Sequence, residues 1–168
     1  MVKIGVISDT HIRNTGVCLP YFVCEIFQGV DIILHAGDLL IEEVIIELEA
    51  IAPTYAVAGN NDHFSLFSKY GKRKIIEAGN KRIGLTHGSG RFKTHISAFT
   101  EFNKDNVDCI VFGHSHIPYN KIVDGVLLFN PGSPTDKRFQ SMYSLGVLYI
   151  DKHIKGDIYY FKDKNNPT

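Results

Sequence analysis

The stretch Ile32-Ile33-Leu34-His35-Ala36-Gly37-Asp38 is a short apolar run that ends in a glycine and an acid. The run is too short for helical periodicity and rich in β-branched residues, so it predicts a buried strand. Gly37 permits a sharp turn directly after that strand. We therefore expect Asp38 at the carboxyl end of a central strand, where open α/β sheets bind their ligands.

Four other apolar runs of the sequence also end on side chains that can bind a metal. Val2 to Ile7 precedes Asp9 and His11, Tyr55 to Ala58 precedes Asn60, Ile83 to Thr86 precedes His87, and Cys109 to Phe112 precedes His114 and His116. Aspartate, asparagine and histidine side chains all serve as metal ligands in proteins. Their recurrence at strand ends predicts that these residues meet in one site.

Two of these turns carry their polar residues at alternate positions. Asp9 and His11 are separated by one residue, as are His114 and His116. In an extended segment, the side chains of residues i and i+2 point to the same side. We therefore expect each pair to reach a single ion.

The composition of the 168 residues predicts one domain, residues 1–168, with a core that needs no staples. Lysine plus arginine number 18, as do aspartate plus glutamate, so no basic surplus favours binding to nucleic acid or to an anionic membrane. The chain shows neither a targeting pattern nor an apolar run long enough to cross a membrane, which predicts a cytoplasmic location.

The three cysteines lie among apolar neighbours. Cys18, Cys24 and Cys109 form no C-x-x-C motif, and their odd count leaves at least one thiol unpaired. We expect reduced thiols that pack as small hydrophobic side chains.

Periodicity divides the chain into two halves with different topology. Apolar positions at helical spacing over residues 20–28 and 42–51, between the expected strands, predict a βαβαβ unit with parallel strands. Later turns favour two hairpins, Lys74 to Glu77 with Lys81 to Thr86 and Asn120 to Val123 with Val126 to Phe129. We also expect a loop over residues 64–72 and a short helix from residue 94. The chain should close with an antiparallel pair of strands over residues 144–150 and 155–161, followed by a frayed tail from Asn165 to Thr168. The implied fold class is α/β, or α+β, with a two-sheet β-sandwich flanked by helices.

The seven candidate ligands are too many for one ion. A four-coordinate zinc ion takes four ligands, so three oxygen and four imidazole donors fit two ions that share a carboxylate, with Asp38 as the bridge. Two cations about 3.5–4 Å apart clamp a phosphoryl group and lower the pKa of a shared water toward neutrality. The donor set thus predicts hydrolysis of phosphoesters by a metal-bridging hydroxide.

The set of motifs resembles a known family, the calcineurin-like metallophosphoesterases, and within it the small single-domain phosphodiesterases of prokaryotes. The matching motifs are Asp9-Thr10-His11, Gly37-Asp38, Gly59-Asn60-Asn61-Asp62, His87-Gly88, Gly113-His114-Ser115-His116 and the turn Asn130-Pro131-Gly132-Ser133. The resemblance implies the calcineurin-like fold. It also implies that one metal is held by Asp9, His11 and His116, that a second is held by Asn60, His87 and His114, and that Asp38 bridges them.

One position departs from the family pattern. Many members carry a histidine after the motif asparagine, poised to protonate the leaving group, where this chain has Asn61. Asparagine has no proton to donate at neutral pH. His63 is then either a substitute acid or a solvated loop residue. Arg13 and Asn61 are the candidates for substrate binding. Arg13 either binds a phosphate oxygen of the substrate or is a solvated surface residue, and the same two interpretations hold for Lys137 and Arg138.

We predict a metal-dependent phosphodiesterase that uses two divalent ions. Manganese is the expected metal, and iron, cobalt, nickel, zinc and magnesium are alternatives for the same donors. Its partner is a small phosphoester, with nucleotides among the candidates. The alternatives are a phosphomonoesterase and a non-catalytic scaffold like the retromer subunit of the same fold. Phe64, Leu66, Phe67 and Tyr70 form either an apolar contact surface, which would suit a homo-oligomer, or part of the core.

Overall fold

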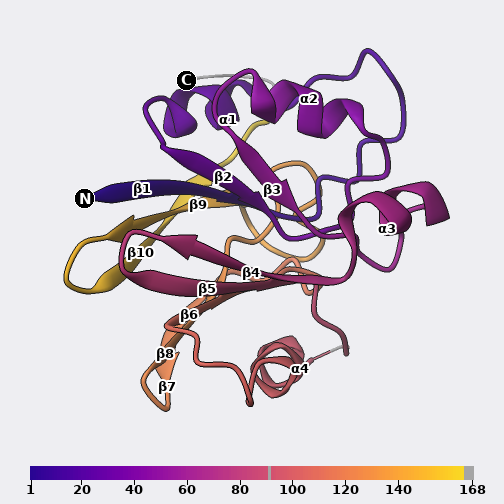
Figure 1. The fold of residues 1–168 in the computed structure, drawn as a ribbon. Helices are drawn as coiled ribbons and strands as arrows, with labels where there is room; N and C mark the ends of the chain where they lie inside the picture. Colours follow the sequence, from indigo (N-terminus) through magenta and orange to yellow (C-terminus); the bar gives the residue numbers. More distant parts are fainter. Residues whose placement is uncertain (91, 165–168) are drawn as a thin grey trace.

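The computed structural model describes residues 1–90 and 92–164, and the expected frayed tail lies outside these residues. Figure 1 shows two sheets packed face to face, with helices on the outer side of each. Helices α1 (Tyr21–Phe27) and α2 (Glu43–Glu49) cover the first sheet, and α4 (Thr94–Glu101) covers the second. The layered architecture confirms the predicted β-sandwich flanked by helices.

The first sheet has the strand order β10-β9-β1-β2-β3. Its strands are β1 (Val2–Ile7), β2 (Ile32–His35), β3 (Thr54–Ala56), β9 (Tyr143–Ile150) and β10 (Ile154–Phe161). Strand β1 pairs in parallel with β2, and β2 with β3, while β9 runs antiparallel to β1. The predicted βαβαβ unit and the closing antiparallel pair are therefore confirmed. The carboxyl ends of β1, β2 and β3 share one edge of the sheet.

The second sheet has the strand order β4-β5-β6-β8-β7. Its strands are β4 (Arg73–Ala78), β5 (Lys81–Thr86), β6 (Cys109–Val111), β7 (Tyr119–Val123) and β8 (Val126–Asn130). The two predicted hairpins are the antiparallel pairs β4 with β5 and β7 with β8. Strands β5 and β6 are parallel, so they also end at one edge.

The central core fills the space between the sheets. It joins side chains of β1 and β2 with side chains of β5, β6 and β8, and Phe129 of β8 is completely buried within it. Two glycines of the facing sheet make room for that ring: a Cβ at Gly146 would lie 2.4 Å from Phe129 Cε1, and one at Gly156 would lie 2.5 Å from Phe129 Cε2. Close packing of a large ring against bare backbone thus fixes how the sheets meet.

The segment over residues 64–72, expected as a loop, instead contains helix α3 (Phe64–Tyr70). Leu66 is buried and Tyr70 packs against the same core cluster, because residues four apart share one face of a helix. Phe64 is 81% exposed, so the four apolar residues of this segment are divided between core and surface. Only contact with the rest of the fold makes this short helix stable.

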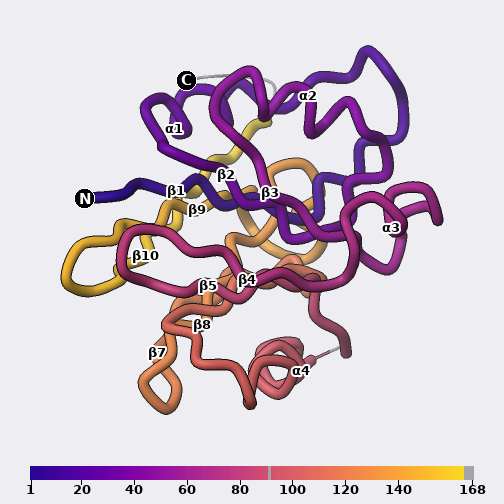
Figure 2. The backbone as a smooth tube through the Cα atoms, viewed as in Figure 1, coloured from indigo at the N-terminus to yellow at the C-terminus, as the bar shows by residue number. Residues whose placement is uncertain are grey.

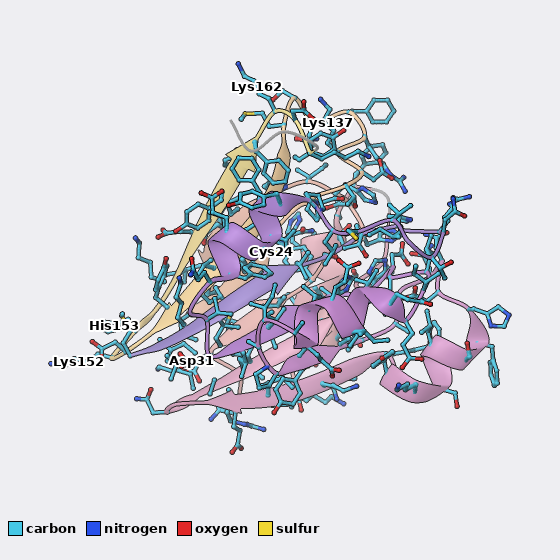
Figure 3. The ribbon with its side chains drawn as sticks, turned by 90° about the horizontal axis from the view of Figure 1, so that it is seen from above. Cys24, Asp31, Lys137, Lys152, His153 and Lys162 are labelled. Carbon is cyan, nitrogen blue, oxygen red and sulfur yellow. The ribbon has the colours of Figure 1, made fainter. Side chains whose placement is uncertain are left out.

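Two of the three cysteines are exposed, which contradicts the expectation that they pack in the interior. All three are free thiols, as predicted, and only Cys109 is buried. Cys24 lies on α1 (Figure 3), whose inward positions are the buried Val23 and Phe27, so its own side chain faces outward.

Among the residues described, no helix is both long enough and apolar enough to span a membrane.

We expect Phe129→Ala to lower the free energy of unfolding by about 3–5 kcal/mol, because it removes a fully buried ring from a site that two glycines have shaped to it. Ile122→Ala on the neighbouring strand is the control, since Ile122 is 71% exposed and its truncation should change the value by no more than about 0.5 kcal/mol. Urea denaturation of both variants measures the difference. Equal effects of the two substitutions would contradict this packing.

Candidate metal centre

The predicted ligands come from five turns that follow β1, β2, β3, β5 and β6. Five of these seven residues have left-handed backbones: Asp9 (φ 53°), His11 (φ 46°), Asp38 (φ 58°), His114 (φ 67°) and His116 (φ 58°). Such angles are uncommon in residues other than glycine and carry strain that the surrounding fold must hold. Their concentration here marks the turns as a site built for a purpose other than stability.

Asp9 is fully buried, and its two carboxylate oxygens have different surroundings. Oδ2 accepts hydrogen bonds from Ser8 Oγ at 2.7 Å and from the backbone N–H of His114 at 2.9 Å. Oδ1 lies 3.4 Å from His116 Nε2 and 3.9 Å from both His11 Nε2 and His87 Nε2. One oxygen therefore fixes the carboxylate, and the other faces three imidazoles.

Asp38 is also buried and lies between two of the same imidazoles. Its Oδ2 is 3.4 Å from His11 Nε2 and 3.4 Å from His87 Nε2. Asn61 holds this carboxylate twice, because its backbone N–H donates to Oδ1 at 2.8 Å and its side-chain amide donates to Oδ2 at 2.6 Å. A Cβ at Gly59 would lie 2.2 Å from Asp38 Oδ1, so the backbone must come close to this group.

Two histidines are oriented by backbone carbonyl groups. His87 Nδ1 donates to the carbonyl of Ala36 at 2.7 Å, and His116 Nδ1 donates to the carbonyl of Asp136 at 2.5 Å. This bond leaves Nε2 of each ring directed at the carboxylates, as in metal-ligating histidines. Asn60 Oδ1 completes the group, since it lies 3.1 Å from His87 Nε2 and 2.8 Å from His114 Nδ1.

The electrostatics of the cluster favour a positive charge between the two acids. Burial lowers the pKa of His87, but the hydrogen bond with Asp38 and the charges of Asp9 and Asp38 outweigh burial and raise it to about 9. Burial raises the pKa of Asp38, but His87 and Asn61 outweigh it and hold the value well below its usual range. Burial lowers the pKa of His11 and His114, which favours the neutral rings whose nitrogen lone pair can bind a cation.

Three buried atoms have no hydrogen-bond partner anywhere in the described chain: Asp9 Oδ1, His11 Nε2 and His116 Nε2. All three point into the cluster. Two groups of residues bring their ligand atoms within 4.8 Å of one another: Asp9 with His11 and His116, and Asp9 with Asp38 and His87. Buried polar atoms without partners are rare and costly, and a divalent cation would satisfy these. The donors fit a metal.

The spacing argument for the paired residues is wrong in detail. Asp9 and His11 do face the same group, but His114 and His116 separate: His114 joins Asn60, and His116 joins Asp9. Neither pair is extended, because all four residues have left-handed backbones. The positive φ angles turn successive side chains in directions that strand geometry does not allow.

The other predicted residues lie around this cluster in different relations to it. Arg13 and Asn61 are exposed and line one cavity with His11. His63 is exposed, and its Nδ1 lies 3.4 Å from Ser65 Oγ. These observations favour the interpretation of His63 as a solvated loop residue. His35 is fully buried, accepts from the N–H of Gly37 at Nδ1 and reaches Thr10 Oγ1 with Nε2 at 3.1 Å, so it braces the turn before Asp38.

Asp62 is the residue that sequence reasoning left without a role. Its carboxylate accepts from the backbone N–H groups of Asp38 (2.9 Å), Leu40 (2.8 Å) and Gly59 (2.7 Å), which ties two of the strained turns together. Burial raises its pKa against these three bonds. Its place in Gly59-Asn60-Asn61-Asp62 was the available signal, because an acid close to a ligand often holds backbone N–H groups.

Comparison with known proteins gives consistent results. A family model described as the calcineurin-like phosphoesterase superfamily domain matches residues 2–153. A probable metallophosphoesterase of Methanothermobacter thermautotrophicus is 36% identical over 150 residues, which cover 88% of this chain and 86% of that protein. A phosphodiesterase of Methanocaldococcus jannaschii is 30% identical over 146 residues, which cover 78% of this chain and 83% of that protein.

Solved structures agree with the sequence comparison. An archaeal phosphodiesterase superposes with a TM-score of 0.76 at 25% identity, covering 95% of this chain and all (100%) of that one. Vps29 of Chaetomium thermophilum also has a TM-score of 0.76, at 19% identity over 96% of this chain and 99% of that one. The second likeness shows a shared fold alone. Together they confirm the predicted calcineurin-like architecture.

The raised pKa of His87 predicts how the metal-free protein responds to pH. Since its folded value is about 9 and its unfolded value about 6.5, its stabilising effect should be complete below pH 6.5 and disappear as pH rises through 9. In chelator, urea unfolding should show a loss of up to about 3 kcal/mol over this window. His87→Asn should flatten the profile and His153→Asn, at an exposed position, should not. If the pH dependence of the free energy of unfolding were unchanged in His87→Asn, a group other than His87 would be its cause.

Proposed function

This chain belongs to the calcineurin-like phosphoesterase superfamily, and we propose that it is a phosphodiesterase with a dinuclear metal centre. The single observation that carries the proposal is the set of unpartnered ligand atoms, Asp9 Oδ1, His11 Nε2 and His116 Nε2, buried beside Asp38. Membership of the family supports a metal-dependent phosphoester hydrolase. The named phosphodiesterases among its relatives support the diester preference.

We propose the ligand assignment that the family resemblance implies, and the contacts of Asn60 with His87 and His114 support it. Asp9, His11 and His116 would hold one ion, and Asn60, His87 and His114 the other. Asp38 would bridge, because its Oδ2 is equally distant, at 3.4 Å, from one imidazole of each set. Oxygen and nitrogen donors in this mixture suit manganese, and iron, cobalt, nickel, zinc or magnesium are alternatives. Such a pair of cations lowers the pKa of a water nucleophile and offsets charge on the phosphoryl group.

The protein's own residues position the reacting groups. Ser8 and the N–H of His114 hold Asp9, and Asn61 holds Asp38, so both carboxylates are fixed before substrate arrives. Arg13 lines the adjoining cavity and carries the fork of donors that suits a phosphate oxygen. Asn61 supplies no proton, so the leaving group departs as an anion or takes a proton from solvent.

We place the reaction in the cytoplasm, because the three cysteines are free and two are exposed, which suits a reducing compartment. The substrate is a small phosphoester, with nucleotides among the candidates. Phosphomonoesters differ only in the substrate, and comparison of mono- and diester analogues separates the two activities.

We expect His116→Ala and Asp38→Asn each to reduce hydrolysis of bis(4-nitrophenyl) phosphate in manganese by at least about 100-fold, since each removes a ligand. His153→Ala is the matched control: His153 is exposed at the tip of the β9–β10 hairpin (Figure 3) and should retain full activity. Chelator should abolish the wild-type activity, and circular dichroism should show that the variants remain folded.

A folded wild-type protein that binds no divalent ion and hydrolyses no diester would contradict this proposal. It would instead support the non-catalytic scaffold.

Substitution of Asn61 tests the missing proton donor. Asn61→His should accelerate release of a poor leaving group, such as the nucleoside of thymidylyl-thymidine, by up to about 100-fold, because a positioned acid then protonates the departing oxygen. Release of 4-nitrophenolate, which needs no proton, should change little. Asn61→Gln keeps an amide and should show no gain for either substrate. Equal acceleration of both leaving groups would rule out protonation as the cause.

A further inference from the structure

A cavity of about 690 Å³ adjoins the proposed centre at His11 and Asn61. One wall is the long connection between β1 and α1, drawn in indigo in Figure 2, and the other is the segment around Thr135 to Arg138. The proposed function uses only the end of this cavity nearest the ligands. The rest of the volume is available for parts of a substrate that do not react.

The two walls are attached to the turns that carry the ligands. Thr135 Oγ1 donates to the carbonyl of Thr10 at 2.5 Å, and Ser133 Oγ donates to the carbonyl of Asp9 at 2.8 Å. The β1–α1 connection is fixed at its far end, where the N–H of Leu19 donates to Glu47 Oε2 at 2.8 Å. The cavity is therefore a formed part of the site rather than a gap between unconnected loops.

Positive charge collects in this cavity although the chain as a whole is neutral. Among the described residues, its lining includes the cations Arg13, Arg138 and Lys164 and a single carboxylate, Asp136. That carboxylate lies 3.6 Å from Arg138 Nε and 3.8 Å from His116 Nδ1, so it is already engaged. The carboxylate offsets part of the charge of Arg138, and the remaining positive charge of the lining favours a ligand that brings a further negative charge.

The remaining lining offers an apolar surface beside these cations. Leu19, Val17 and Tyr21 all line the cavity; Leu19 is buried, while Val17 and Tyr21 are 52% and 59% exposed. An exposed tyrosine ring is a suitable platform for a flat, weakly polar group such as a nucleobase.

We propose that this cavity selects a linear nucleotide diester that carries a second phosphate. The reacting phosphate lies at His11, Asn61 and Arg13, the base packs on Tyr21 and Val17, and the second phosphate meets Arg138 and Lys164. This substrate class rests on the proposed phosphodiesterase function, but recognition of the second phosphate is a property of the cavity and is measurable without turnover.

The kinetic test compares two substrates with the same base and the same leaving group. Thymidine 3′-(4-nitrophenyl phosphate) and its 5′-phosphorylated form differ only in the second phosphate. We expect kcat/KM for the 5′-phosphorylated form to exceed that of its partner by at least about tenfold, the factor expected of a charge-assisted hydrogen bond. Equal values for the two substrates would overturn the proposal.

Three variants locate the effect. Arg138→Ala and Lys164→Ala should each remove most of the preference for the second phosphate while leaving hydrolysis of bis(4-nitrophenyl) phosphate within about twofold. Lys152→Ala is the control of equal charge: Figure 3 shows Lys152 at the tip of the β9–β10 hairpin, far from Lys137, the chain neighbour of Arg138. A preference that persists in both Arg138→Ala and Lys164→Ala would overturn the assignment.

A binding measurement separates the cavity from the chemistry. Cys18 lines the cavity, Cys24 lies outside it on α1 and Cys109 is buried, so alkylation followed by mass spectrometry reads one thiol against an internal reference. Thymidine 3′,5′-bisphosphate should protect Cys18 and not Cys24 in the wild type, and should fail to do so in Arg138→Ala. Protection without hydrolysis of any diester would uphold the cavity and reject the enzyme. Hydrolysis without protection would reject the cavity alone.

Discussion

The rest of this structure depends on two buried carboxylates, Asp9 and Asp38, whose negative charges need a partner of opposite sign. Each has one oxygen that faces imidazole nitrogens, and Asp9 Oδ1 has no hydrogen-bond donor among the described residues. Charged groups removed from water need a partner of opposite sign, so the cluster calls for positive charge at its centre. The raised pKa of His87 has the same cause, because a proton on this ring supplies positive charge beside the two carboxylates. A divalent cation meets it better, because it also engages the unpartnered nitrogens of His11 and His116.

The surrounding fold holds these groups in backbone conformations that they would not adopt alone. The N–H groups of Asp9 and His11 donate to the carbonyls of Gly37 and Asp38, each at 3.0 Å, so the first two strained turns fix each other. Asp62 holds the turn of Asp38 from the other side through three backbone N–H groups. Rigid packing of the two sheets through Phe129 supplies the frame. Strain is thus concentrated at the site and offset by the core.

Family membership and substrate choice rest on different parts of the molecule. The strand ends and their ligands carry the proposed hydrolytic chemistry, and they hold the motifs that resemble the family. In our proposal, Asn61 limits which leaving groups suit that chemistry, because an amide cannot give up a proton. The cavity between the β1–α1 connection and Arg138 determines what else the substrate can carry. Substrate class is therefore decided by loops on a rigid scaffold, as is usual for binding sites.

The sequence alone predicted the two sheets, the strand ends and which seven side chains meet, because short apolar runs ending in polar residues are a local pattern. It could not predict helix α3, since Leu66 and Tyr70 form a helix only against the first sheet. It misjudged Cys18 and Cys24, whose exposure depends on which face of the connection and of α1 turns inward. The spacing of His114 and His116 wrongly placed both on one ion, although the family resemblance implied that they separate, because left-handed turns are held by contacts remote in the chain. The role of Asp62 and the cationic cavity likewise exist only where the folded chain brings distant loops together.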